Sequence, residues 1–247
     1  MGRLVALLII ALWQAAISRA PFYLYYDALI ALFAVSGLMQ VAVSRMGGRW
    51  RVSLVVFVLV GAVLFADIVG FTRQCEERPP AEAIDLLRGF HRRMEQTIFA
   101  FGGTLDKFLG DGVMATFGTP RSGSRDAANA LGCARAMLGE IDAWNCDRRA
   151  RGQAEVRIEI GVHTGPVVLG DVGSSRHLEF AVIGDTVNIA SRLESLTREL
   201  EVTIVISERL ARLTAQQGGG DALAGFSPPA PQAIRGRAEP LSVPSFQ

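Results

Sequence analysis

The sequence of 247 residues contains only three cysteines and three histidines. Cys75, Cys133 and Cys146 are too far apart, and odd in number, for a disulfide framework or a CxxC zinc pattern. No histidine pair has HExxH spacing, so a zinc site is not expected. These absences favour a reducing compartment, in which the cysteines serve as packing residues.

The chain also lacks a strong charge of either sign. Its 25 basic and 24 acidic side chains give a formal net charge of +1. Without a basic surplus, no electrostatic argument favours nucleic acid as a partner, and we expect none. Internal repeats and low-complexity tracts are missing as well.

Hydrophobic residues are abundant, at 50% of the chain, and they are concentrated at its beginning. Two apolar runs, 4–18 and 28–43, are separated by aromatic residues typical of a membrane interface. Arginines before the first run and after the second predict a hairpin of two transmembrane helices with both ends in the cytoplasm. A signal peptide is the alternative, because residues 18–20 (Ser-Arg-Ala) resemble a cleavage site. The second run favours the hairpin, and hence a protein of the cell membrane whose remaining part is cytoplasmic.

This interpretation divides the chain into a membrane segment (1–51), a short apolar lead-in (52–61) and a second domain (62–247). Residues 52–60, VSLVVFVLV, are apolar enough to suggest a third span. A third span would place the rest of the chain outside the cell. We therefore interpret this stretch as the lead-in to a strand or as a membrane-surface segment.

From residue 62 onward, strand-like and helix-like patterns alternate. Apolar positions in 81–101 recur with helical spacing, and the Asp-Gly pair in 104–117 is a signal for a tight hairpin turn. The order strand, helix, hairpin, helix, strand is that of the ferredoxin-like split βαβ arrangement. The predicted fold class is therefore α+β, with an antiparallel sheet and helices on one face. Further elements are expected at 124–149 (helix), 156–162, 165–173 and 177–184 (strands), 186–196 (helix), 202–206 (strand), then a short helix and a last strand.

Asp67 lies in the apolar run AVLFADIVGFT, which otherwise is typical of a buried strand. An unpaired carboxylate there is costly, so it is expected either to cap a loop or to bind a metal ion. Asp111, at the tip of the predicted hairpin, comes to the same sheet edge if the first strand is central. Two carboxylates beside a glycine suit Mg²⁺, and the amides of Val69, Gly70, Phe71 and Thr72 are placed to cradle a triphosphate.

Four segments, in order, resemble the catalytic domain of class III adenylate and guanylate cyclases. They are VLFADIVGFT, GGTLDKFLGDGVMATFG, IGVHTGPVVLGDVG and VIGDTVNIASRLE, and the resemblance extends from residue 62 to about 247. It implies that Asp67 and Asp111, with the carbonyl of Ile68, bind two Mg²⁺ or Mn²⁺ ions.

The same resemblance assigns the other roles residue by residue. Lys107 matches the base-contacting lysine of adenylate cyclases, where guanylate cyclases carry Glu. Asn188 and Arg192 match the pair that orients the ribose and stabilises the transition state, and their i, i+4 spacing places them on one helical face. Arg235 or Arg237 matches a late basic residue on the phosphates. Taken singly, Lys107 and Arg192 would be interpreted as solvated surface charges.

Ala181, seven residues before Asn188, departs from the family pattern. Adenylate cyclases resemble this region but carry Asp or Thr there, and guanylate cyclases commonly carry Cys. Alanine offers no hydrogen bond to the purine, which should weaken base discrimination by ~1–3 kcal/mol.

The resemblance implies cyclisation of ATP to 3′,5′-cyclic AMP and pyrophosphate at the interface of a homodimer. In that family, one protomer supplies the metal ligands and the other supplies Lys, Asn and Arg. Two alternatives stay open: a catalytically weak or relaxed-specificity homologue that acts as a regulatory partner, and another two-carboxylate cyclase such as a diguanylate cyclase. The GG[DE]EF signature of the latter is missing, since Gly102-Gly103 is followed by Thr-Leu-Asp.

Overall fold

The structure is a computed structural model that describes residues 57–76, 79–174, 177–235 and 239–247. The predicted membrane segment 1–51 and residues 52–56 of the lead-in lie outside the described residues. Within the described part, no helix combines the length and hydrophobicity needed to cross a membrane.

A seven-stranded sheet is built around β1, which pairs antiparallel with β3 on one side and with β4 on the other. β2 lies outside β3, and β5 pairs with the second half of β4. β4 also pairs with β6, in parallel, and β6 pairs with the last strand, β9. The strands are β1 (Phe57–Ile68), β2 (Thr104–Leu109), β3 (Gly112–Phe117), β4 (Ile158–Ser174), β5 (His177–Ile183), β6 (Ile204–Ile206) and β9 (Ser245–Phe246), with β7 (Ala230–Gln232) and β8 (Leu241–Val243) as a separate pair.

The helices follow the apolar periodicity of the sequence. In α4 the buried residues Leu86, Phe90, Met94 and Ile98 recur every four positions, which confirms the helix predicted there. The helices are α3 (Phe71–Glu76), α4 (Pro80–Ala100), α5 (Asp126–Ala150), α6 (Asp185–Leu200) and α7 (Glu208–Gln216), with a 3₁₀ turn at Gly220–Leu223.

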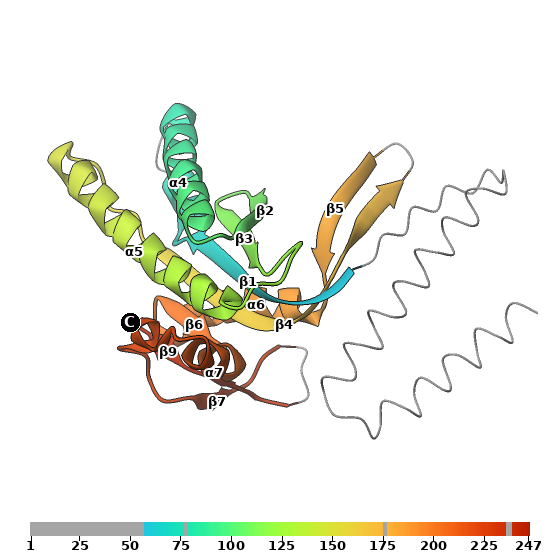
Figure 1. The fold of residues 1–247 in the computed structure, drawn as a ribbon. Helices are drawn as coiled ribbons and strands as arrows, with labels where there is room; N and C mark the ends of the chain where they lie inside the picture. Colours follow the sequence, from blue (N-terminus) through green and yellow to red (C-terminus); the bar gives the residue numbers. More distant parts are fainter. Residues whose placement is uncertain (1–56, 77–78, 175–176, 236–238) are drawn as a thin grey trace, which may run out of the picture. The chain divides into compact units, whose positions relative to one another are not determined.

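Helices cover both faces of the sheet, so the prediction of helices on one face was wrong (Figure 1). Alternate residues of β1, such as Leu64 and Ala66, pack against α4 and α5 in the main core. The opposite face carries Val63, which packs in a second cluster with Ala190 of α6. Gly161 allows α6 to pack closely against β4, because a Cβ there would overlap the backbone nitrogen of Glu194.

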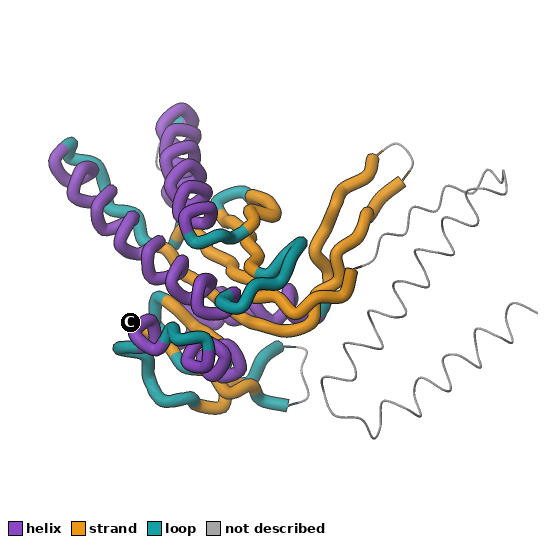
Figure 2. The backbone as a smooth tube through the Cα atoms, viewed as in Figure 1, coloured by secondary structure: helices purple, strands orange, loops and turns teal. Residues whose placement is uncertain are grey.

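β1 begins at Phe57, so residues 57–61 of the lead-in belong to the central strand, in line with the interpretation of this stretch as a lead-in to a strand. Two further details differ from the sequence-based expectations. The strands predicted at 156–162 and 165–173 are one continuous strand, β4, which leaves the sheet with β5 as a long two-stranded ribbon (Figure 2). The sheet is mixed rather than antiparallel, because β4 and β6 run in parallel. The α+β class itself is confirmed.

Candidate active site

Asp67 and Asp111 lie at the same end of the sheet. Asp67 is the penultimate residue of β1 and faces Gly112, the first residue of β3. Asp111 precedes Gly112 in the turn, and its carbonyl accepts a hydrogen bond from the Ile68 amide (3.3 Å). A Cβ at position 112 would lie 3.1 Å from Asp67 Oδ1, so glycine leaves room for the carboxylate. The fold thus brings the predicted metal ligands Asp67, Ile68 and Asp111 together.

The electrostatics of this end suit a cation. Burial, and next the nearby charge of Asp111, raise the pKa of Asp67 to about 6. A divalent cation would remove both penalties by compensating the two carboxylates. Their oxygens are the hard ligands that Mg²⁺ and Mn²⁺ prefer, so the residues present fit such an ion.

The turn that carries Asp111 is held by α4. The imidazole of His91 stacks on the ring of Phe108, with 4.0 Å between ring centroids. Its Nε2 donates a hydrogen bond to the carbonyl of Gly110 (3.0 Å), the residue before Asp111. Sequence reasoning missed His91, since a lone histidine on a helix gives no local signal of this contact.

One of the four backbone amides predicted to bind the triphosphate already has a hydrogen-bond partner. The amide of Val69 donates to the carbonyl of Arg157 (2.9 Å) and is therefore not available to a phosphate, which corrects that part of the prediction. Gly70 has a φ of +67°, which a residue with a side chain rarely adopts, and α3 begins directly after it. The amides of Gly70, Phe71 and Thr72 remain as candidates.

Arg198, near the end of α6, joins three carboxylates at the same end of the sheet. Its Nε donates to Glu159 (2.6 Å), and its Nη2 donates to Glu194 (3.2 Å) and to Asp67 (3.3 Å). Glu159 faces Asp67 across the β1–β4 pair. Burial raises the pKa of Glu194 to about 7, although the charge of Arg198 acts in the opposite direction. The Glu194–Arg198 spacing of four residues was a signal in the sequence, but it did not indicate contact with Asp67.

The other predicted site residues lie on several different elements of the fold. Lys107 is half-buried on β2, with its ammonium 3.7 Å from the carboxylate of Asp106. Ala181 faces Gly170 in the β4–β5 ribbon. Asn188 is exposed and Arg192 half-buried on α6, one turn apart. Arg235 is exposed beyond β7, and Arg237 lies outside the described residues.

Asn188 and Asp67 lie toward opposite ends of the β1–β4 pair. α6 begins beside β4, where the Thr186 hydroxyl donates to the carbonyl of Pro166 (2.7 Å). Pro166 faces Val60, seven residues before Asp67 on β1, which corresponds to roughly 23 Å of extended strand. Among the described residues, neither Asn188 nor Arg192 forms a hydrogen bond or ion pair with Asp67 or Asp111. One chain therefore carries two separate groups of predicted site residues.

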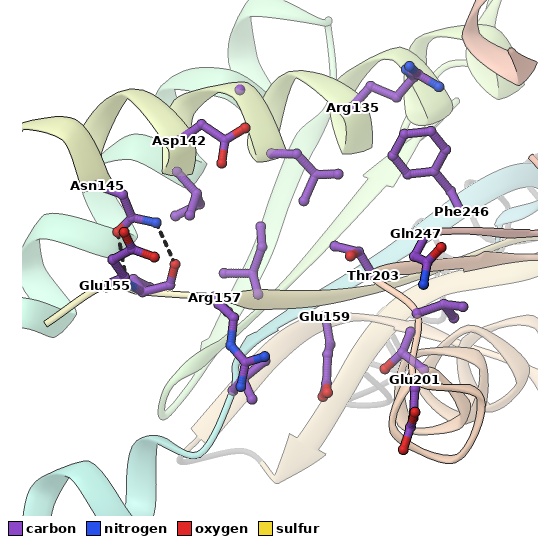
Figure 3. Close-up of a pocket in the computed structure, with 18 of the residues that line it drawn as sticks. Arg135, Asp142, Asn145, Glu155, Arg157, Glu159, Glu201, Thr203, Phe246 and Gln247 are labelled. Carbon is purple, nitrogen blue, oxygen red and sulfur yellow. Dashed lines mark hydrogen bonds between the residues drawn. The ribbon is translucent and has the colours of Figure 1, made fainter. Parts of the chain in front are cut away.

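A cavity of about 940 Å³ adjoins the Asp67 end of the sheet (Figure 3). It lies between α5, the start of β4, the end of α6 and the C-terminus, and it shares Val69, Glu159 and Arg198 with the surroundings of Asp67. In Figure 3, Arg135 lies above Phe246 at one side, and Asn145 is hydrogen-bonded to the backbone of Val156 at the other. The polar residues that line this cavity, such as Arg135 and Asn145, were not among the site residues predicted from the sequence.

Comparison with known proteins identifies a family for most of this domain. Residues 60–219 match the family described as "Adenylate and Guanylate cyclase catalytic domain". The chain is 35% identical over 163 residues to adenylate cyclase 1 of Rhizobium meliloti (strain 1021). That alignment covers 65% of this chain and 24% of the relative, so the matched part is about a quarter of the relative's length.

Two solved structures agree with this match. The adenylyl cyclase CyaB from P. aeruginosa has a TM-score of 0.68 and 29% identity, covering 78% of this chain and 95% of that chain. The guanylyl cyclase Cya2 has a TM-score of 0.67 and 28% identity, covering 76% and 92% respectively. The chain is thus similar in structure to one protein named as an adenylyl cyclase and to one named as a guanylyl cyclase.

Proposed function

Because the chain belongs to the adenylate and guanylate cyclase catalytic domain family, we propose that it is an adenylate cyclase that forms 3′,5′-cyclic AMP and pyrophosphate from ATP. The observation that carries this proposal is the meeting of Asp67 and Asp111 at one end of the sheet. The adenylate cyclase from Rhizobium meliloti and the adenylyl cyclase CyaB are the similar proteins that support it.

In this reaction the ribose 3′-hydroxyl releases its proton to solvent water and its oxygen attacks the α-phosphorus. The bond from the α-phosphorus to the oxygen that bridges to the β-phosphorus breaks, and pyrophosphate leaves. Mg²⁺ or Mn²⁺ bound by Asp67, Asp111 and the Ile68 carbonyl would supply Lewis-acid activation and neutralise phosphate charge. The amides of Gly70, Phe71 and Thr72 would orient the polyphosphate, with Arg235 or Arg237 as further basic contacts.

We place Asn188 and Arg192 in the site of a second copy of the chain. In one chain Asn188 and the metal ligands lie toward opposite ends of the β1–β4 pair, as the register and the Thr186–Pro166 hydrogen bond indicate. A symmetric dimer would bring the Asn188 end of one copy to the Asp67 end of the other and complete two sites. Arg192 would then stabilise negative charge that develops on the phosphates, and Asn188 would orient the ribose.

The preference for ATP rests on Lys107 and is limited by Ala181. Lys107 offers a donor that suits an adenine ring nitrogen, and it offers no acceptor for the N1–H and amino group of guanine. Ala181 leaves the purine edge without a second polar contact. This position favours a second candidate, a catalytically weak or relaxed-specificity cyclase that accepts both ATP and GTP.

The proposed location is the cell membrane, with the catalytic domain in the cytoplasm, where ATP is available. It rests on the two apolar runs and the flanking arginines of residues 1–51. An alkaline-phosphatase fusion after Gln247 should be inactive in a bacterial host, because that enzyme folds only after export. An active fusion would contradict the location.

The experiment for the activity is an assay of the purified full chain with Mn²⁺ and either ATP or GTP. We expect cyclic AMP as the main product, with a smaller amount of cyclic GMP. Cyclic GMP in excess would identify a guanylate cyclase. Neither product, from a folded and dimeric protein, would favour the regulatory-partner alternative.

A further inference from the structure

Arg198 occupies one oxygen of Asp67, the carboxylate that the proposed function assigns to the metal. The contact is an ion pair from Nη2 to Oδ2 at 3.3 Å. Arg198 lies outside the four motifs on which the family resemblance depends, and Asn188 and Arg192 account for the catalytic roles expected of α6. Its position therefore requires a separate explanation.

We propose that Arg198 is an exchangeable counter-ion of Asp67: it compensates this carboxylate in the metal-free protein and gives up the contact when a divalent cation binds. This inference rests on the proposed function, because it takes Asp67 as a metal ligand. Arg198 is then a positioning residue that sets the affinity for the cation without contacting substrate.

The three ion pairs of Arg198 are unequal in a way that allows the exchange. The pair with Glu159 is short, at 2.6 Å, and engages Nε, which bonds no other carboxylate of the cluster. The pair with Asp67 is the longest of the three and shares Nη2 with Glu194, at 3.2 Å. The ion pair between Arg198 and Asp67 can therefore break while Glu159 and Glu194 still bind the guanidinium.

Burial explains why Arg198 stays in place after Asp67 has been released. The side chains of Glu159 and Glu194 are only 10% and 11% exposed, so losing their counter-ion would leave two poorly solvated charges. The side chain of Asp67 is 27% exposed, and that of Arg198 is 54% exposed. The exchange thus takes place at the more solvated side of the cluster, which an ion from solution can reach.

The charge of Arg198 also opposes cation binding. A positive group in direct contact with a ligand carboxylate lowers the affinity of that carboxylate for a second positive group. Screening by solvent reduces this effect, because about half of the Arg198 side chain is exposed. Removing the charge should tighten binding of a divalent cation roughly fivefold to twentyfold.

The test measures Mn²⁺ binding to the full chain without nucleotide, from the electron paramagnetic resonance signal of free Mn²⁺. Arg198→Gln should lower the dissociation constant roughly fivefold to twentyfold. The matched control is Arg157→Gln, which removes an equal charge two residues from Glu159 on an exposed side chain. The control should stay within about twofold of the wild type. Equal dissociation constants for Arg198→Gln and the wild type would overturn the inference.

A second pair of variants covers the case in which Arg198→Gln does not fold. In a Glu194→Gln background, only Asp67 and Glu159 lose their counter-ion when Arg198 is replaced. Glu194→Gln/Arg198→Gln should bind Mn²⁺ more tightly than Glu194→Gln alone, and equal binding would again contradict the inference.

The outcome for Asp67→Asn separates this inference from the proposed function. If the wild type binds Mn²⁺ and Asp67→Asn does not, the metal site stands, and the Arg198 comparison decides the inference alone. If Asp67→Asn and Arg198→Gln both bind as the wild type does, the metal assignment of Asp67 fails together with the inference.

Discussion

The two ends of the β1–β4 pair differ in how their polar residues are satisfied. At the Asp67 end, three carboxylates and Arg198 form a cluster within one chain, and Asp111 lies close enough to raise the pKa of Asp67. At the other end, Asn188 is exposed at the first turns of α6, and Ala181 is half-buried in the β4–β5 ribbon. At the Asp67 end the charged side chains form ion pairs within one chain, whereas at the other end the side chain of Asn188 is exposed. This difference is what the proposed dimer requires, since each copy would supply the group that the other copy's site lacks.

The largest expected effect is at the Asp67 end. Asp67→Ala or Asp111→Ala removes one of the two carboxylates that would hold the metal, so cyclic nucleotide synthesis should fall at least roughly 100-fold. The assay is cyclic AMP formation with saturating Mn²⁺ and ATP. Circular dichroism should show a folded protein for both variants, because each removes an anion from a crowded negative site. Activity within about tenfold of the wild type would contradict the assignment.

An intermediate effect is expected at Ala181. Ala181→Thr restores a polar group at the position that the resemblance assigns to purine contact, so the preference for ATP over GTP should increase by up to roughly tenfold. The measurement is kcat/KM for both nucleotides in the wild type and the variant. Ala181→Ser is a second test of the same contact, since it adds a hydroxyl with a smaller change in volume and should shift the ratio in the same direction. An unchanged ratio in both variants would mean that position 181 does not contact the base.

The smallest effect concerns the stability of the metal-free protein. The pKa values of Asp67 and Glu194 are raised to about 6 and about 7, so the folded state retains protons that the unfolded chain has already released. Stability should therefore fall as the pH rises from about 4 to about 7.

The Asp67 share of this pH effect can be isolated by substitution. Asp67→Asn should raise the Tm at pH 8 by roughly 2–4 °C, the shift that about 1 kcal/mol produces in a domain of this size. Thermal unfolding in the presence of EDTA at pH 5 and pH 8 provides the measurement. A Tm difference between the two proteins that is the same at both pH values would contradict a titrating Asp67.

Much of the Asp67 end could be predicted from the sequence, because its determinants are local. The apolar run around Asp67 indicates a buried strand, and the Asp-Gly turn places Asp111 at the tip of a hairpin. Their meeting required only that β1 be central, as the order β2–β3–β1–β4 confirms.

The residues that could not be predicted depend on packing between distant segments. Glu159 lies in the strand predicted at 156–162, and its burial under α6 has no signal in the sequence of that strand. Arg198 reaches Asp67 because α6 crosses β4 closely at Gly161 and continues to Leu200. The apolar periodicity of a helix indicates which side of the helix is buried, but it does not indicate which face of the sheet the helix covers. The prediction that one face of the sheet carries no helix was wrong for this reason.

The central claim, that each active site is shared between two copies, is tested most directly by mixing two inactive chains. In a dimer of Asp67→Ala with Arg192→Ala, one site carries both substitutions and the other carries neither. Random pairing makes half of the dimers mixed, each with one intact site of two, so activity should return to about a quarter of the wild-type value. No recovery, with mixed dimers confirmed by tagged co-purification, would contradict shared sites.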